Sequence, residues 1–316
     1  MKHFFAFMAA VLLTGSLAFA QAPSCATPGT NNAFLGIQTI RLWPGPAPDA
    51  KGNGCYDIPA LTIFDPQRGT ANGSAVIIFP GGGYEHLAGN LEGRQIADWF
   101  TSKGFRAFIL TYRLPSHGYL LPVPLIDARR AIQTVRAHAQ EYHIAPNRIV
   151  IIGFSAGGHL AALAATKPVP GDPNAKDPIG RVSSRPDYLV LGYPWIGAVI
   201  TNYSHLNYCK LFKLTSECAA LQAKYDPDLF VTKDTPPTFI YHTFDDQTVP
   251  IQQSLGFFQA LVKAGVQTEY HVFASGAHGS GLGKGNPSLD QWPGLLETWL
   301  RGKGLLTVDK DVVGRR

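Results

Sequence analysis

Charged residues are scarce in this chain of 316 residues: Asp, Glu, Lys and Arg together make up 16%, against about a quarter in an average protein. The formal net charge is +5, and the basic residues are scattered rather than clustered. With 45% hydrophobic residues and no charged run, the composition is that of a folded globular protein and not of a disordered one. The same features argue against nucleic acid as a partner.

Long apolar runs are also missing, apart from one near the N-terminus. Residues 4–13 are all apolar, follow Lys2 and His3, and lead to the small-residue end Ala18-Phe19-Ala20. This pattern is typical of a signal peptide, and the run is short for a transmembrane helix. We predict that residues 1–20 are a signal peptide cleaved after Ala20. The mature protein is then exported, periplasmic or secreted, and makes no membrane contact.

The sequence has no pattern of metal ligands. None of the four cysteines belongs to a C-x-x-C or His-rich spacing that would indicate a metal site. An even number of cysteines in an exported chain favours two disulfides instead. Pairing neighbours along the chain gives Cys25–Cys55 and Cys209–Cys218, and the other two connectivities stay open.

Short apolar runs alternate with helix-like patterns along the rest of the chain. Runs such as Val76-Ile77-Ile78-Phe79 are typical of strands buried on both faces of a parallel sheet. The expected strands are 37–42, 61–64, 75–79, 106–112, 149–154, 188–193, 238–243 and 268–273. The expected helices are 92–103, 125–142, 156–165, 251–264 and 293–303. This order predicts an α/β fold, a mostly parallel sheet of about eight strands flanked by helices.

Residues 21–316 are expected to form a single domain, because an α/β fold often uses this much chain. The stretch 195–236 interrupts the alternation after the sixth strand. An insertion of this length is usually functional, so we regard it as a candidate cap.

The most informative motif is Gly153-Phe154-Ser155-Ala156-Gly157, a G-x-S-x-G sequence between an expected strand and a helix rich in small residues. This is the context of a nucleophile elbow, where a tight turn exposes a reactive serine. The first amides of the following helix point to the same place, where negative charge develops. Ser155 is therefore the predicted nucleophile.

A second motif, Pro80-Gly81-Gly82-Gly83-Tyr84, follows an expected strand directly. Three glycines allow the backbone to approach a ligand, and a loop at this position supplies oxyanion-hole amides in esterases. We predict that the amides of Gly82, Gly83 and Ala156 form this hole. A phosphate-binding loop is disfavoured, because no Lys-Ser or Lys-Thr follows the glycines.

An acid and a histidine are expected after the serine, in that order. Asp245 and Asp246 follow the strand 238–243, and His278 follows the last strand, so all three lie at the expected carboxyl edge of the sheet. His278 is the predicted general base. The choice between the two aspartates favours Asp246. His159 is expected to pack, and His242 lies inside an expected strand.

These motifs resemble those of α/β-hydrolase esterases often described as acetylxylan-esterase-like or feruloyl-esterase-like. The shared segments are Leu42-Trp43-Pro44-Gly45, Pro80-Gly81-Gly82-Gly83-Tyr84, Tyr112-Arg113-Leu114-Pro115, Asp127-Ala128-Arg129-Arg130-Ala131, Gly153 to Leu160, Asp246-Gln247-Thr248-Val249-Pro250 and Gly276-Ala277-His278-Gly279. The resemblance covers most of the mature chain and implies no metal or organic cofactor. Its D-x-x-V-P pattern favours Asp246 as the triad acid. The chain differs in having Pro80 where a histidine often precedes the glycines.

The expected function is hydrolysis of carboxylic esters through an acyl-enzyme, with small acyl esters of polysaccharide, above all acetyl esters, as substrates. Alternatives are a general short-chain carboxylesterase, a peptidase or amidase, and a non-catalytic protein that kept the fold. A peptidase of this kind usually carries a propeller, for which the chain leaves no room.

Roles outside this set are predicted for a few more residues. Tyr84 and Trp195 are candidate substrate contacts. Glu85 and Glu92 are expected at the surface. Asp127, Arg129 and Arg130 are expected in ion pairs or on a solvated helix face.

Overall fold

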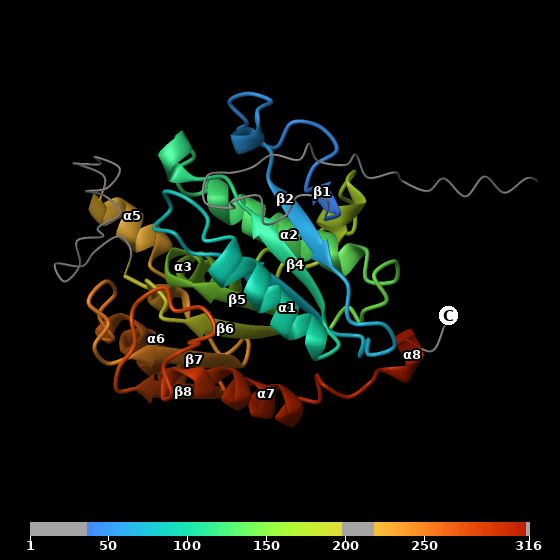
Figure 1. Ribbon diagram of the computed structural model, residues 1–316. Helices are drawn as coiled ribbons and strands as arrows, with labels where there is room; N and C mark the ends of the chain where they lie inside the picture. The colour runs from blue at the N-terminus through green and yellow to red at the C-terminus, as the bar shows by residue number, and fades with distance from the viewer. Residues whose placement is uncertain (1–36, 198–217, 314–316) are drawn as a thin grey trace, which may run out of the picture.

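The computed structural model describes residues 37–197 and 218–313, which build one eight-stranded sheet covered by helices (Figure 1). The strand order is β1-β2-β4-β3-β5-β6-β7-β8. β2 runs antiparallel to both of its neighbours, β1 and β4, and all other neighbouring strands are parallel. The strands are β1 Thr39–Arg41, β2 Ala60–Phe64, β3 Ala75–Phe79, β4 Arg106–Thr111, β5 Ile149–Phe154, β6 Tyr188–Gly192, β7 Thr238–Thr243 and β8 Thr268–Phe273.

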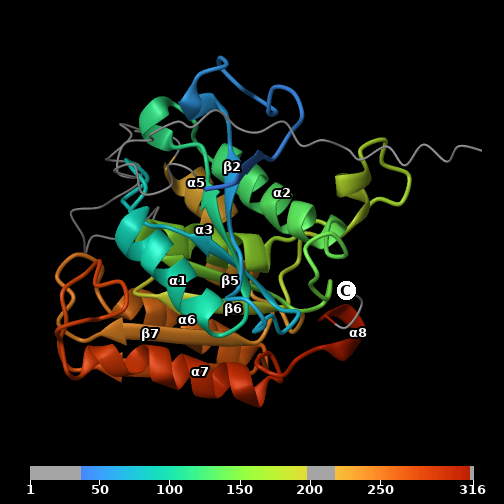
Figure 2. The ribbon, with the colours of Figure 1, turned by 45° about the vertical axis from the view of Figure 1, so that its right-hand side comes forward.

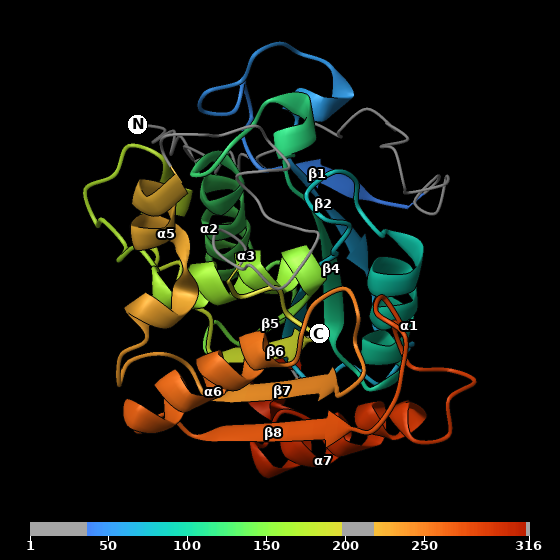
Figure 3. The same cartoon turned by 90° about the vertical axis from the view of Figure 1, so that its left-hand side faces the viewer.

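Two hydrophobic layers enclose the sheet, because the central strands are buried on both faces. Ile77 of β3 packs in the layer of α2 (Val123–Ala137), α3 (Ser155–Thr166) and α6 (Gln252–Lys263). Its neighbours Val76 and Ile78 pack in the layer of α1 (Gln95–Ser102) and α7 (Trp292–Gly302), as the alternation of side chains in a strand requires. Figures 2 and 3 show the two helical layers from different sides.

The predicted α/β architecture is confirmed, and all eight expected strands are present. The expected helix 92–103 begins later, because residues Asn90–Arg94 form a π-helical turn before α1. The expected helix 125–142 is α2, which ends at Ala137 with His138 as its cap. Two short helices were not predicted, α5 (Cys218–Tyr225) and α8 (Lys310–Val313).

Several predictions fall wholly or partly outside the described residues. These are the signal peptide 1–20, the middle of the candidate cap 195–236, and the disulfides through Cys25 and Cys209, all of which stay predictions. Within the described residues, each helix is too short or too polar to cross a bilayer.

The parallel strands bring four loops to one edge of the sheet. Pro80 follows β3, Ser155 follows β5, and Asp246 and Gly276 follow β7 and β8. Because the carboxyl ends of parallel strands meet at the same edge, residues distant in the sequence lie close together there.

Candidate active site

Ser155 lies at the turn between β5 and α3 and has a positive φ of 51°. A non-glycine residue with such a backbone angle is strained, and such strain is typical of functional turns. The neighbouring glycines make the turn possible. A Cβ on Gly153 would lie 2.3 Å from the Gly157 oxygen, and a Cβ on Gly157 would lie 2.1 Å from the Phe79 oxygen.

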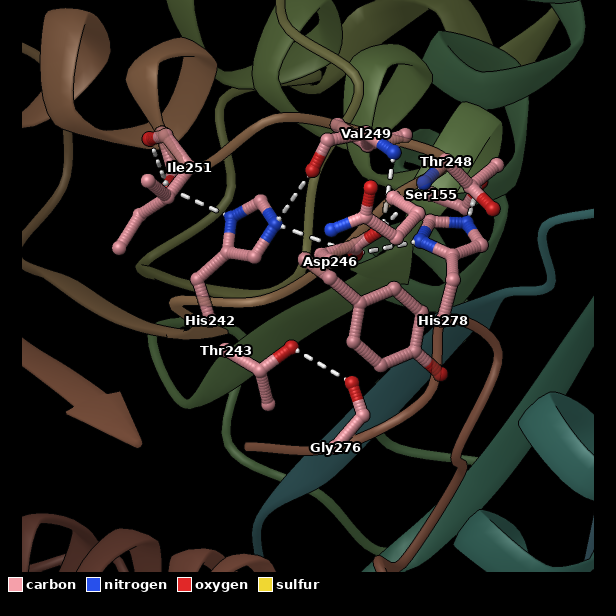
Figure 4. Close-up of polar contacts among 12 residues, drawn as sticks. Ser155, His242, Thr243, Asp246, Thr248, Val249, Ile251, Gly276 and His278 are labelled. Atoms are coloured by element: carbon pink, nitrogen blue, oxygen red, sulfur yellow. Dashed lines mark hydrogen bonds and ion pairs between the residues drawn. The ribbon is translucent and has the colours of Figure 1, made fainter. Parts of the chain in front are cut away.

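The structure brings the three predicted triad residues together (Figure 4). The His278 Nε2 lies 2.9 Å from the Ser155 Oγ, and the His278 Nδ1 lies 2.7 Å from the Asp246 Oδ2. Ser155 is buried, with 4% of its surface exposed. The hydrogen bond to Asp246 orients the imidazole so that Nε2 can accept the serine proton.

The Asp246 carboxylate is held by a set of donors. Its Oδ1 accepts hydrogen bonds from the backbone amides of Thr248 at 2.8 Å and Val249 at 2.9 Å. Burial acts against the charged form, but hydrogen bonds from His242, His278 and the Val249 amide, together with the charge of His278, hold the Asp246 pKa well below its usual value. The group is therefore a carboxylate at neutral pH and can stabilise an imidazolium.

Asp245 occupies a different position. Its side chain lies at the surface and its Oδ1 accepts a hydrogen bond from the Gly276 amide at 2.9 Å. It thus stabilises the loop that carries His278, while Asp246 contacts the histidine itself.

His242 is a part of this site that the sequence analysis placed only inside a strand. Its ring is fully buried in β7, with Nε2 3.3 Å from the Asp246 Oδ2 and 2.9 Å from the Val249 oxygen. Its Nδ1 lies 2.7 Å from the Ser254 Oγ. Both partners of Nε2 are acceptors, so this nitrogen carries a proton and donates to them. The sequence shows that His242 and Asp246 are four positions apart. This spacing alone does not predict that the turn after β7 brings the Asp246 side chain back to His242.

The glycine loop reaches the nucleophile. A Cβ on Gly81 would lie 2.9 Å from the Ser155 Cβ, and Gly82 and Gly83 have positive φ angles of 121° and 65° that glycine adopts readily. In the described part of the chain, the amides of Gly82, Gly83 and Ala156 donate to no protein acceptor. These three amides are therefore available to bind an oxyanion. Their role as the oxyanion hole stays a prediction.

Glu92 requires a correction, because it is not at the surface. It is 3% exposed and lies against the glycine loop, with its Oε2 2.8 Å from the Gly81 amide nitrogen. The Tyr193 hydroxyl donates to its Oε1 at 2.9 Å. The sequence shows that Glu92 lies close to the glycine loop, but it does not show that the carboxylate is buried.

Tyr84 and Trp195 also require a correction, since both side chains are completely buried. The Tyr84 hydroxyl lies 2.7 Å from the His159 Nδ1, and the His159 Nε2 lies 2.9 Å from the Tyr225 oxygen. Burial lowers the pKa of His159 to about 4, so this histidine is neutral and structural. The Trp195 amide donates to the Ser155 oxygen at 3.0 Å. Both residues support the elbow by packing and are not placed to contact a substrate.

No group of three or more His, Cys, Asp or Glu side chains within the described ranges is placed to hold a metal ion. The contacts of Ser155, His278 and Asp246 support nucleophilic chemistry, because the serine hydroxyl lies beside a histidine that can accept its proton.

Two family models match the chain. Residues 61–175 match the family described as BD-FAE, and residues 211–301 match the prolyl oligopeptidase family. The elbow motif lies in the first match, and Asp246 and His278 lie in the second.

Relatives and solved structures agree with these matches. The chain is 32% identical to an acetylxylan esterase of Xylanibacter ruminicola over 76% of the chain, and spans about half of that relative's length (48%). A crystal structure of an acetyl ester-xyloside bifunctional hydrolase from Caldicellulosiruptor lactoaceticus superposes with a TM-score of 0.75 at 37% identity, covering 84% of this chain and 96% of that one. A Thermogutta terrifontis esterase with bound propionate gives a TM-score of 0.67 at 26% identity, covering 86% and 96%.

The sheet topology, the strained serine turn and the Ser155–His278–Asp246 contacts are those of a serine hydrolase. The chain belongs to the α/β-hydrolase superfamily, in the group that includes these esterases. The resemblance to acetylxylan-esterase-like proteins that the motifs indicated is thereby confirmed.

Proposed function

We propose that the protein is a serine carboxylic-ester hydrolase that removes acetyl or other small acyl groups from carbohydrate esters. The observation that carries the proposal is the continuous set of contacts from Ser155 through His278 to Asp246 at a nucleophile elbow. The acetylxylan esterase and the acetyl ester-xyloside hydrolase to which the chain is similar support the substrate class.

The first half of the reaction follows from this geometry. The Ser155 hydroxyl donates its proton to the His278 Nε2 as the Oγ attacks the ester carbonyl. The amides of Gly82, Gly83 and Ala156 stabilise the resulting oxyanion, each donor contributing about 3 kcal/mol. Asp246 stabilises the imidazolium, which then protonates the departing sugar oxygen as the bond between this oxygen and the acyl carbon breaks; the sugar leaves as an alcohol and the acyl group stays on Ser155.

The second half regenerates the enzyme. His278 accepts a proton from water, and the hydroxide formed attacks the acyl carbonyl of the Ser155 ester. The same amides stabilise the second oxyanion. Collapse of this intermediate returns the proton from His278 to the Ser155 Oγ and releases the carboxylic acid. No step needs a metal or an organic cofactor.

A second candidate is a peptidase or amidase, because residues 211–301 match the prolyl oligopeptidase family. The same triad can attack an amide, so the contacts do not separate the two activities. The esterase relatives, which are similar over a larger part of the chain, favour the ester.

Export is part of the same proposal. The N-terminal pattern of residues 1–20 and the even number of cysteines support a protein that works outside the cytoplasm with two disulfides. A polysaccharide too large to enter a cell must be deacylated there, which fits the proposed substrate.

The test compares wild type with Ser155→Ala on p-nitrophenyl esters of increasing acyl length, acetylated xylan and an aminoacyl p-nitroanilide. Loss of the nucleophile is expected to lower kcat up to roughly a million-fold. The matched control is Ser102→Ala at the exposed end of α1, which should retain wild-type activity. Full activity of Ser155→Ala contradicts the mechanism, whereas inert xylan with active short esters favours a general short-chain carboxylesterase. Preference for the anilide favours the amidase.

A further inference from the structure

Glu92 is a buried carboxylate beside the catalytic residues that the mechanism above does not use. It lies in the π-helical turn before α1 and is 3% exposed. An ionised side chain in such a place is costly unless it is hydrogen-bonded. Each of its oxygens has a donor, the Gly81 amide at 2.8 Å on Oε2 and the Tyr193 hydroxyl at 2.9 Å on Oε1.

Tyr193 extends this contact to the loop that carries His278. Its hydroxyl accepts a hydrogen bond from the Gly281 amide at 3.1 Å, while its own proton goes to Glu92. Its ring packs edge-on against the His278 imidazole, with 4.9 Å between the ring centres. Tyr193 itself has a positive φ of 35°, so its backbone is held in a strained form directly after β6.

The hydrogen bonds also indicate that the Glu92 carboxyl group is ionised. Both partners donate to it, whereas a neutral acid would need an acceptor for its own proton. Burial raises the pKa of Glu92, and the bonds from Tyr193 and Gly81 and the charge of His278 oppose that rise. The titratable groups that face Glu92 are His278 and the phenols of Tyr112, Tyr193 and Tyr241.

We propose that Glu92 is a positioning residue for ester hydrolysis, with two effects on the site. It fixes the glycine loop and the His278 loop relative to each other through Gly81 and Tyr193. Its negative charge also favours the imidazolium that forms when His278 accepts the serine proton. The inference rests on the proposed function and adds a second buried carboxylate to the one supplied by Asp246.

The first test is Glu92→Gln, which keeps the shape but has only one accepting oxygen for two donors. We expect kcat on p-nitrophenyl acetate to fall about 10- to 100-fold, because small displacements of reacting groups have effects of this size. The acid limb of the kcat/KM profile should move to lower pH, since the lost charge no longer favours a protonated imidazole. Asp246, which contacts His278, and His242, which contacts Asp246, are unchanged. A purely structural role would not move this limb.

The matched control is Glu85→Gln, because this glutamate lies close to the glycine loop in the sequence but has an exposed side chain. It should leave kcat and the pH profile at their wild-type values. A second variant, Tyr193→Phe, removes the hydroxyl but retains the aromatic ring and the Glu92 side chain. It should lower kcat, because the hydroxyl no longer joins Glu92 to the His278 loop.

Circular dichroism and labelling by a fluorophosphonate probe separate the outcomes. A folded Glu92→Gln enzyme with wild-type kcat and an unmoved acid limb overturns the inference. If Glu92→Gln does not fold, Tyr193→Phe decides, and wild-type kcat in that variant overturns it as well. A labelled, active wild type beside unaffected variants rejects this inference alone, whereas a wild type that is neither labelled nor active overturns both it and the proposed function.

Discussion

At the scale of single residues, two neighbouring aspartates show how position decides role. Asp246 is buried and bonded to His278, whereas Asp245 is exposed and bonded to the Gly276 amide. We expect Asp246→Asn to lower kcat about 10⁴-fold, because an amide cannot fix the histidine tautomer in the same way. Asp245→Asn is the matched control and should stay within a few-fold of wild type. Equal losses in the two variants, measured on p-nitrophenyl acetate, contradict the assignment.

The depressed pKa of Asp246 has a consequence for stability. Its usual value is 3.8 and its folded value is lower, so the carboxylate stabilises the fold above about pH 4 and this contribution is lost as the pH falls through the folded pKa. The variant Asp246→Asn has no carboxylate at this position, so it has no such contribution to lose. Denaturant unfolding of both proteins should show the wild type losing more free energy of unfolding than the variant between pH 5 and pH 2. Parallel curves over that range contradict the charged network.

At the scale of elements, the elbow depends on close backbone contact between β3 and α3. A methyl group on Gly157 would lie 2.1 Å from the Phe79 oxygen and 2.5 Å from the Pro80 oxygen, both of them backbone atoms. We expect Gly157→Ala to destabilise the protein by about 1–3 kcal/mol and to lower activity, because the glycine loop must move. Thermal unfolding and ester hydrolysis measure the two effects.

Gly256 provides the matched control, since it lies inside α6 with open space where a Cβ would be. Gly256→Ala should stabilise the fold by about 0.5–1 kcal/mol through helix propensity alone. If both substitutions raise the melting temperature, the close approach at the elbow is not a constraint.

Elements also differ in how well a sequence predicts them. β3, β5, β7 and β8 have the bounds expected from their apolar runs, and the motifs at their ends predicted which loops would meet. Glu92 was placed wrongly, because its partners Gly81 and Tyr193 lie 11 and 101 positions away. Periodicity describes a segment by itself, so it cannot show that a polar residue is buried against another loop. The prediction that Tyr84 and Trp195 contact a substrate missed their burial for the same reason.

At the scale of the whole molecule, one buried ion pair joins segments from three parts of the chain. Arg113, after β4, contacts Asp127 of α2 through two guanidinium nitrogens, with Nη2 2.7 Å from Oδ1 and Nε 3.0 Å from Oδ2. The Arg113 Nη1 also donates to the Pro48 oxygen at 2.6 Å. The sequence predicted an ion pair or a solvated face for Asp127. It is an ion pair with no solvated side, because both side chains are almost inaccessible to solvent.

Because the pair is buried, a substitution that removes only one of its two charges is costly. Asp127→Asn would leave the Arg113 charge buried without its counter-ion, and removing one partner of such a pair costs about 3–5 kcal/mol. That loss is a large part of the free energy of unfolding of a typical domain, which is about 5–15 kcal/mol. Asp98→Asn is the matched control, because Asp98 pairs with Arg94 at 3.8 Å on the surface of α1 and should cost under about 1 kcal/mol. Urea unfolding of the two variants should therefore differ by several kcal/mol in free energy. Similar midpoints would mean that water reaches Arg113 when its partner is removed, and that the segments around Pro48, β4 and α2 are held together by their apolar contacts instead.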